Sequence, residues 1–253
     1  MIPTDDRGLL LGDGLFETIL VSDGTLVLFQ AHHERLARGC RALGLPEPGD
    51  IRGRCEEAAL SLGVRGAVRV TLTAGSGGRG LDRPDEVAPR VVVTAAPAPR
   101  PQGPASLATV AVRRNEGSPA SRLKTLAYLD NVLAREEARA AGADEALMLN
   151  NRGEVACAAA ANLFWLRDGR LFTPALDCGV LDGIMRRQAM NRAASLGIEV
   201  EEVRAARAEL DGAEAVFLTN SLIGVRAVGR LDGAALPQSP LVARLAQALA
   251  DVS

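Results

Sequence analysis

Lysine is almost absent from this chain. Of its 29 basic residues, Lys124 is the single lysine and the other 28 are arginines. An arginine can place a positive charge anywhere, but it does not lose its proton and attack a carbonyl, whereas a lysine amine can be tuned to do so and to form a Schiff base. Two interpretations of Lys124 stay open on composition alone: an amine required as a nucleophile, or a chance survivor of biased composition on a solvated helix face.

Histidine and cysteine are also scarce, which argues against several kinds of site. The only two histidines are adjacent, His32 and His33, so Ser-His-Asp and histidine-metal mechanisms are poorly supplied. The cysteines are scattered without a CxxC pair, which argues against structural zinc and for a reducing cytoplasm. They are Cys40, Cys55, Cys157 and Cys178.

Charge and hydropathy exclude further classes of protein. The formal net charge is −2 with both signs interspersed, so no basic stripe predicts a nucleic-acid partner. No apolar run approaches the ~20 residues of a membrane span, and the N-terminus lacks the layout of a signal peptide. At 253 residues the chain can form one large or two modest domains. We expect a cytoplasmic globular protein that acts on a small molecule, with neither nucleic acid nor membrane as a partner.

Periodicity predicts strands interspersed with helices in two halves, which is typical of an α+β fold with layers in each half. Residues 8–29 are expected to form a hairpin around Asp23-Gly24. We place the domain boundary in the polar connector 113–121, which divides the chain into domains 1–115 and 116–253. Further expected elements are helices at 31–45, 50–62, 128–141, 183–196 and 240–250, and a hairpin over 162–172.

The segment Gly75-Ser76-Gly77-Gly78-Arg79-Gly80 formally matches the dinucleotide-binding pattern GxGxxG. An expected strand precedes it, but residues 81–85 open no helix and another strand begins near residue 90. A Rossmann loop has to open a helix, whose N-terminus binds the pyrophosphate. We therefore reject a nicotinamide site and interpret the segment as a mobile glycine loop over a pocket.

Six stretches, in order and over nearly the whole chain, resemble the class IV (fold type IV) pyridoxal-phosphate enzymes. This family includes branched-chain and D-amino acid aminotransferases and aminodeoxychorismate lyase. The resemblance implies a smaller N-terminal α/β sandwich, a larger C-terminal pseudo-barrel, pyridoxal 5′-phosphate as cofactor and a homodimer. The matching stretches are 12–18, 32–36, Lys124 with Tyr128, 161–164, 183–186 and 219–222.

The same resemblance implies roles for residues that would contact the cofactor ring. Lys124 would bond covalently to the cofactor and then move protons as the general base. Tyr128, about one helical turn later, would hydrogen-bond the phenolate oxygen of the ring. Leu181 would pack against the face of the ring.

A second set of residues would bind the phosphate. Arg35 would bind it through its guanidinium, helped by a helix start and a serine hydroxyl. Taken alone, Arg35 is better interpreted as an ordinary solvated helix arginine, and the serine as a turn-capping residue. His32 is interpreted as a packing or helix-start residue. The other members of this set are Gly183, Ile184, Met185 and Ser221.

One position departs from the family pattern. Most members carry a glutamate five residues before the asparagine of the Asn-Leu-Phe motif, and Cys157 stands there relative to Asn162. The nearest acid, Glu154, falls on the opposite face of a strand. A carboxylate keeps the ring nitrogen protonated and the ring a strong electron sink, and a neutral thiol does so less well. We predict weaker ring protonation, which harms full transamination more than the prompt expulsion of a leaving group.

Three functions stay open. Residues 73–80, 158–165 and 219–226 resemble aminodeoxychorismate lyase, which releases pyruvate and 4-aminobenzoate for folate synthesis. Arg79 and Arg226 are candidates for the two carboxylates of that substrate, near Leu222, although each arginine is equally interpretable as a surface residue. The second function is an aminotransferase for D- or branched-chain amino acids. The third is a member that keeps the fold with impaired catalysis, marked by Cys157.

Overall fold

The computed structural model describes residues 2–250, and the contacts within it group the chain into two compact units. The first contains the chain up to Pro99 together with Leu123–Ala127, and the second contains Arg100–Arg122 and the chain from Tyr128 onward. The division into domains 1–115 and 116–253 stays a prediction. That division would assign strand β5 (Ala105–Thr109) to the first domain, whereas its contacts belong to the second unit.

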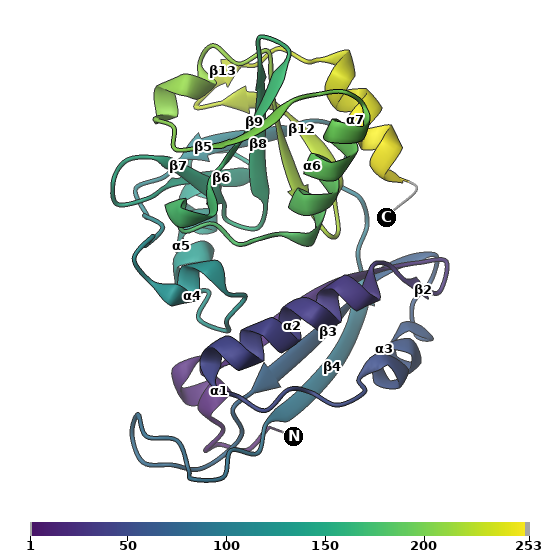
Figure 1. The fold of residues 1–253 in the computed structure, drawn as a ribbon, viewed down its shortest axis with the longest axis vertical. Coiled ribbons are helices and arrows are strands. Elements are labelled where there is room, and N and C mark those ends of the chain that lie inside the picture. The colour runs from purple at the N-terminus through teal and green to yellow at the C-terminus, as the bar shows by residue number, and fades with distance from the viewer. Residues whose placement is uncertain (1, 251–253) are drawn as a thin grey trace. The chain divides into compact units, whose positions relative to one another are not determined.

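A four-stranded antiparallel sheet forms the first unit, in the order β2-β1-β3-β4. Alternate side chains of β1, including Leu15 and Ile19, enter one core with Leu36 of α2 and Cys55 of α3. Helix α2 lies along the face of this sheet (Figure 1). The bounds are β1 (Gly14–Ser22), β2 (Thr25–Leu26), β3 (Arg65–Thr73), β4 (Arg90–Pro97), α1 (Arg7–Leu11), α2 (Phe29–Leu43) and α3 (Arg52–Ala59).

The hairpin expected over residues 8–29 is present across Asp23-Gly24 as β1 and β2, but it is shorter than predicted at both ends. Its start forms helix α1, and its second strand is only β2, because Leu28 takes a positive φ of 53° and α2 begins at Phe29. Leu26 and Phe29 are both buried, one from the strand and one from the first turn of the helix. A run of apolar residues that crosses such a junction looks like a continuous strand in the sequence.

A nine-stranded mixed sheet forms the second unit, in the order β10-β9-β8-β11-β12-β5-β6-β7, with β13 beside β12. The strands are β5, β6 (Glu145–Leu149), β7 (Val155–Ala158), β8 (Asn162–Arg167), β9 (Arg170–Pro174), β10 (Val200–Val203), β11 (Ala215–Asn220), β12 (Gly224–Leu231) and β13 (Ala234–Ala235). The helices are α4 (Pro119–Arg122), α5 (Leu129–Ala140), α6 (Ile184–Ser195) and α7 (Pro240–Ala250), with short 3-10 turns at Leu176–Cys178 and Arg207–Leu210.

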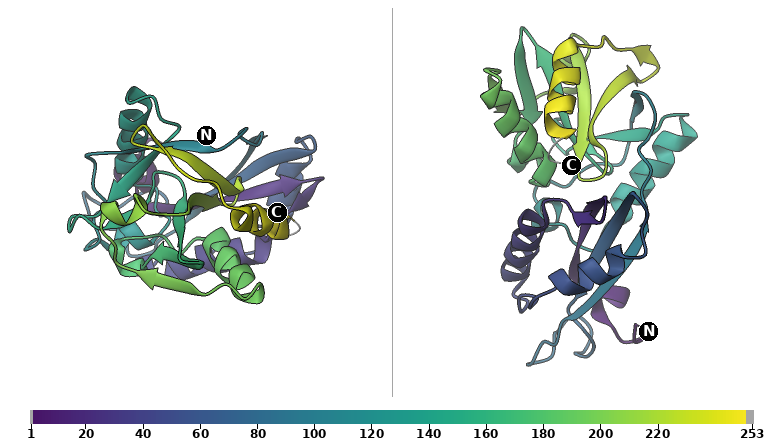
Figure 2. Two further views of the ribbon diagram at one scale, coloured as in Figure 1. Left: turned by 90° about the horizontal axis from the view of Figure 1, so that it is seen from above. Right: turned by 90° about the vertical axis from the view of Figure 1, so that its right-hand side faces the viewer.

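This large sheet curls around an apolar core. Leu147, Leu163 and Val228, from β6, β8 and β12, join one buried cluster although no two of these strands are neighbours in the sheet order. A second cluster lies under α5, where Ala134 and Met148 are fully buried. Helices α6 and α7 contact one another (Figure 2). The predicted α+β class is confirmed.

Two kinds of feature are absent from the part of the chain that the structure describes. Among residues 2–250, no helix has the length and apolar character to cross a membrane. The same residues contain no group of three or more His, Cys, Asp or Glu side chains placed to hold a metal ion.

Candidate active site

Lys124 lies in a turn directly before Thr125, which forms an isolated antiparallel bridge with Leu15 at the edge of β1. The Phe16 amide donates to the Lys124 carbonyl at 2.9 Å, and the Leu126 amide donates to the Gly14 carbonyl at 3.0 Å. A Cβ at position 14 would meet the Leu72 carbonyl oxygen at 2.2 Å, which explains the glycine there. Main-chain hydrogen bonds at the Lys124 carbonyl and the Leu126 amide therefore tie the chain directly after the lysine side chain to β1.

The predicted helical spacing between Lys124 and Tyr128 is wrong. Helix α4 ends at Arg122 and α5 begins only at Leu129, so neither residue lies within a shared helical turn. Tyr128 is the N-cap of α5, with φ −107° and ψ 17°. The segment between the two helices forms main-chain hydrogen bonds with the open edge of β1 and no helix. Such pairing satisfies backbone donors and acceptors that a short helix would leave exposed.

The Lys124 amine contacts an aromatic ring. Its Nζ lies 4.1 Å from the centroid of the Phe16 ring, and the guanidinium carbon of Arg69 lies 3.9 Å from the same centroid. Lys124 is half-buried, and its charge is one of the causes that lower the pKa of His32. The lysine thus stands beside a second charged group of residues in the same unit.

That group is built around the buried carboxylate of Glu17. Arg35 donates to both of its oxygens, at 2.7 Å from Nε and 2.6 Å from Nη2, and His32 Nδ1 lies 2.7 Å from it. Burial raises the pKa of Glu17, but the charges and hydrogen bonds of Arg35 and His32 outweigh it and lower that pKa to about 2. Because an ionised carboxylate only accepts hydrogen bonds, His32 carries its proton on Nδ1.

No role was predicted for Glu17 from the sequence, although its position in the strand pattern indicated one. It alternates with Leu15 and Ile19 on the β1 face that enters the core, and a charged residue on such a face is rarely buried without a partner. In the structure it accepts hydrogen bonds from Nε and Nη2 of Arg35, the predicted phosphate ligand. Burial lowers the pKa of His32, and Glu17 opposes that effect.

In the second unit, Asn162 holds the chain that leads into α6. Its Nδ2 donates to the Leu181 carbonyl at 2.9 Å. A Cβ at Gly183 would meet the Asn162 Oδ1 at 2.0 Å, so no side chain fits at this position. Gly183 is the N-cap of α6, and no side chain among residues 2–250 caps this helix start. The glycine and the asparagine together leave the start of the helix open.

The open helix start fits an anionic group. The first amides of a helix, here those of Ile184 and Met185, have no acceptor within the helix and carry partial positive charge. Nearby on β11, the Thr219 hydroxyl is buried and has no hydrogen-bond partner in the described chain. Thr219 pairs in register with Asn162, so this donor belongs to the same corner of the unit. These donors suit the phosphate of a cofactor.

The loop that carries Ser221 is held by its neighbour Asn220. The Asn220 Oδ1 accepts from the amides of Leu222 and Ile223, both at 2.9 Å, and its Nδ2 donates to the Ala160 carbonyl at 2.9 Å. Ser221 and Leu222 are half-buried on this loop. The loop therefore has a defined shape that follows directly from β11.

Cys157 lies on β7 opposite Met148, in the cluster under α5. Burial raises the pKa of its thiol, while Arg114 lowers it and Glu145 raises it. The thiol is therefore neutral near pH 7. The Glu154 carboxylate is bound elsewhere, by Asn150 at 2.7 Å and by Arg152 at 2.9 Å.

The two candidate substrate arginines belong to different units. Arg79 is exposed on the glycine loop of the first unit. Arg226 lies on β12 of the second unit, where it donates to the Gly103 carbonyl at 3.1 Å and to Asp144 at 3.3 Å. A substrate carboxylate would have to compete with these partners, so the substrate role of Arg226 stays a prediction.

Comparisons with known proteins identify the family. The family described as amino-transferase class IV matches residues 14–231. The chain belongs to this family. A Methanocaldococcus jannaschii protein provisionally named a branched-chain-amino-acid aminotransferase is 32% identical over 90% of this chain and 82% of its own length.

Two solved structures share the fold over almost the full length. The crystal structure of 4-amino-4-deoxychorismate lyase from Pseudomonas aeruginosa has a TM-score of 0.89 and 34% identity, covering 99% of this chain and 95% of its own. A hypothetical aminotransferase from Mycobacterium tuberculosis in its PLP-bound form has a TM-score of 0.88 and 26% identity, covering 100% and 93%. The predicted fold type IV architecture and pyridoxal-phosphate-dependent enzyme class are confirmed.

Proposed function

We propose that the protein is a 4-amino-4-deoxychorismate lyase, which releases pyruvate and 4-aminobenzoate. The observation that carries the choice is the neutral, buried thiol of Cys157 where the family pattern has a glutamate. Without a carboxylate the cofactor ring nitrogen is less protonated, so a reaction that expels a leaving group at once suffers less than a full transamination. The similarity to the Pseudomonas aeruginosa lyase supports the same choice.

The described residues support a pyridoxal 5′-phosphate site. We propose that Arg35, oriented by Glu17, binds the phosphate, together with the amides of Ile184 and Met185 and the hydroxyl of Ser221. Tyr128 would hydrogen-bond the ring oxygen, Leu181 would pack on the ring and Cys157 would face its nitrogen. The hydrogen bond from Asn162 to the Leu181 carbonyl and the bare Gly183 leave this helix start without a side-chain cap among the described residues.

Lys124 would supply both the covalent attachment and the proton transfers. When bound, pyridoxal phosphate provides an electron-withdrawing group that is joined to the amine of the substrate. The Lys124 amine would then take the proton from the carbon that bears this amine and assist loss of the enolpyruvyl group as pyruvate. Arg79, Arg226 and Leu222 are the proposed contacts for the carboxylates and body of the substrate.

An aminotransferase for branched-chain or D-amino acids is the second candidate. The name of the Methanocaldococcus jannaschii relative favours it. A member that keeps the fold with impaired catalysis is the third candidate, and the retained single lysine argues against it.

We also propose that the protein is a cytoplasmic homodimer. Leu9 and Leu10 of α1 are each 63% exposed and Leu129 of α5 is 68% exposed, and contacts between copies would bury such side chains. Sedimentation equilibrium of the purified protein tests the oligomeric state, and a monomer at micromolar concentration would contradict the proposal.

The composition allows a sharp test of the cofactor attachment. Apart from the terminal α-amine, Lys124 is the only primary amine in the chain. Borohydride reduction of the protein loaded with pyridoxal phosphate should therefore place the cofactor mass on the tryptic peptide 123–135. A Lys124→Arg variant keeps the charge but cannot attach the cofactor, and should lose both the label and the visible absorption band. A label that persists in Lys124→Arg would overturn the assignment.

The substrate is tested separately with the unmodified holoenzyme. Aminodeoxychorismate should yield pyruvate and 4-aminobenzoate in equal amounts, with no need for a keto acid. Transfer of an amino group from D-alanine or leucine to a keto acid, without lyase products, would select the aminotransferase instead. Cofactor attachment without either reaction would select the third candidate.

A further inference from the structure

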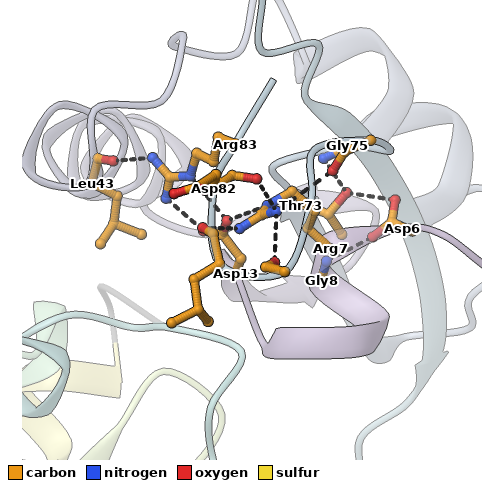
Figure 3. A network of polar contacts seen from close by, with 12 residues as sticks. Asp6, Arg7, Gly8, Asp13, Leu43, Thr73, Gly75, Asp82 and Arg83 are labelled. Carbon is orange, nitrogen blue, oxygen red and sulfur yellow. Dashed lines mark hydrogen bonds and ion pairs between the residues drawn. The ribbon is translucent and has the colours of Figure 1, made fainter. Parts of the chain in front are cut away.

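The glycine loop between β3 and β4 closes around a single guanidinium, that of Arg7 (Figure 3). Arg7 is only 4% exposed. Its Nη2 donates to the Leu81 carbonyl and its Nη1 to the Asp82 carbonyl, both at 2.9 Å. Longer contacts of 3.4 and 3.5 Å reach the carbonyls of Gly80 and Gly77. One side chain thus donates to backbone carbonyls along most of the loop.

Arg7 is itself held by Asp13, which also binds the end of the loop. The Arg7 Nε donates to Asp13 Oδ2 at 2.9 Å. Arg83 donates to both Asp13 oxygens, at 2.9 and 2.6 Å, and to the Leu43 carbonyl at 2.6 Å. Hydrogen bonds from Arg83 are the largest cause of a lowered pKa of Asp13, so the carboxylate is ionised and accepts from both arginines.

The start of the loop is tied to the same helix. The Arg7 amide donates to the Gly75 carbonyl at 2.8 Å. Asp6 caps α1 by accepting from the Gly8 amide at 2.9 Å, and its other oxygen accepts from the Thr73 hydroxyl at 2.9 Å. Helix α1 is therefore anchored to the end of β3, immediately before the loop begins.

The glycines of the loop serve close packing. A Cβ at Gly75 would meet the Ala88 carbonyl oxygen at 2.1 Å, and a Cβ at Gly78 would meet the Asp82 carbonyl oxygen at 2.1 Å and Arg7 Nη1 at 3.0 Å. Both glycines have positive φ, 83° and 82°. The sequence suggested a mobile loop, but glycine is also required wherever backbone approaches backbone this closely.

We propose that Arg7 is a positioning residue for substrate recognition: it holds the loop from Gly75 to Arg83 in a preformed shape that presents the exposed Arg79 to a carboxylate of the substrate. The inference rests on the proposed function, because it takes an anionic substrate as the ligand of Arg79. A loop that is already ordered loses little conformational entropy when substrate binds. Preordering of the loop by Arg7 should therefore increase the affinity for substrate. Arg7 lies beneath the loop and takes no part in the chemical step.

The test compares variants that loosen the loop by two independent routes. Arg7→Lys keeps the charge and loses the fork that reaches the carbonyls. Gly78→Ala pushes a methyl group against Asp82 and Arg7. The matched control is Gly24→Ala, where φ is 77° and no atom lies within 4 Å of the added Cβ, so it has similar backbone strain away from the loop.

Two readouts report the loop without any reaction. The Gly75 amide donates to the Thr73 hydroxyl at 3.1 Å and the Asp82 amide to the Arg79 carbonyl at 3.1 Å. Hydrogen exchange of these two amides should be slow in the wild type and in Gly24→Ala, and roughly tenfold faster in Arg7→Lys and Gly78→Ala. Trypsin offers the second readout, because Arg79–Gly80 is a cleavable bond whereas Arg83 precedes proline. The same two variants should be cut early at Arg79. Equal hydrogen exchange and equal trypsin cleavage in the wild type and the variants would show that Arg7 does not hold the loop, and would overturn the proposal.

Kinetics with the holoenzyme test the link to substrate. Arg7→Lys should raise KM for aminodeoxychorismate roughly tenfold and leave kcat nearly unchanged, as expected for an interaction that is the same in ground and transition states. A loosened loop with unchanged KM would overturn the role in recognition. If neither the wild type nor any variant is active, but hydrogen exchange still differs between the wild type and the loop variants, the proposed function fails. The role of Arg7 in holding the loop then remains supported. If Arg7→Lys does not fold, Gly78→Ala decides.

Discussion

Replacing Glu17 by glutamine should destabilise the first unit and remove a specific part of its response to acid. The carboxylate is 1% exposed and receives a two-pronged hydrogen bond from Arg35. Glutamine keeps the size of the side chain, but it leaves the Arg35 guanidinium, whose side chain is 11% exposed, without its counter-charge. Breaking one side of a buried ion pair costs about 3–5 kcal/mol.

The pH dependence follows from the lowered pKa. A fall from 4.5 to about 2 on folding corresponds to roughly 3 kcal/mol of stabilisation by the ionised group. Because the folded pKa lies below the unfolded one, this stabilisation is complete above pH 4.5 and is lost as the pH falls towards 2. In that window the wild type should lose up to about 1.4 kcal/mol per pH unit more than Glu17→Gln.

Urea unfolding at pH 7, 5, 4 and 3 measures this difference. Far-UV circular dichroism follows both units, whereas the fluorescence of Trp165, the single tryptophan, reports the second unit alone. The control is Glu47→Gln, which breaks an ion pair with Arg41 whose side chains are 46% and 58% exposed. An exposed pair of this kind contributes about 0–1 kcal/mol, so this variant should stay near the wild type.

The two free-energy curves should converge as the pH approaches 2. A constant offset between wild type and Glu17→Gln from pH 5 to pH 3 would refute the reasoning, since it would mean that Glu17 has the same pKa folded and unfolded. A loss at pH 7 no larger than that of Glu47→Gln would show that Arg35 does not depend on this carboxylate.

Three further predictions concern the second unit and the thiols. Gly183→Ala should weaken pyridoxal-phosphate binding at least about tenfold, because the methyl group displaces Asn162 from the start of α6; equilibrium dialysis measures it, with the open helical position Gly53→Ala as control. Cys157→Glu should raise the pKa of the cofactor ring nitrogen and speed amino-group transfer relative to lysis, read by absorption titration and by product ratio; an unchanged titration would contradict the role of this position. Native protein at pH 7 should show no thiol that reacts within minutes with a disulfide reagent, and four after unfolding, because burial raises the pKa of three thiols to about 11 and also raises that of the fourth; the three are Cys40, Cys55 and Cys178.

Local pattern predicted most elements of the second unit. The hairpin expected over 162–172 is present as β8 and β9, and the helix expected over 183–196 is α6. These segments carry complete signals: alternation with a two-residue turn at Asp168-Gly169, and a glycine before a helical pattern. Prediction failed where two elements share one apolar run, as at Leu28, because periodicity cannot mark a junction inside the run.

The identity of the central lysine was easier to predict than its setting. Lys124 was predicted because it is the only lysine in the sequence and because of its spacing to Tyr128. The assumption that this spacing meant a helical turn was wrong, because the segment is held at the edge of β1 by main-chain hydrogen bonds and an isolated bridge between Leu15 and Thr125. That edge is available because β2 pairs only with the last residues of β1, a property of the whole sheet that no local pattern contains.

The stretch from Gly12 to Thr18 shows why a motif can be recognised before it can be explained. Gly14 leaves room for the Leu72 carbonyl beside the paired lysine segment, Asp13 joins the two arginines that hold the glycine loop, and Glu17 orients Arg35. Most of the partners of these three residues lie well away in the sequence, so each requirement is set by tertiary contact. Positions in β1 and directly before it therefore serve the lysine, the loop and the predicted phosphate ligand separately. Substitutions at the three positions should then give three distinct defects: misplacement of Lys124, loosening of the loop and loss of Arg35 orientation.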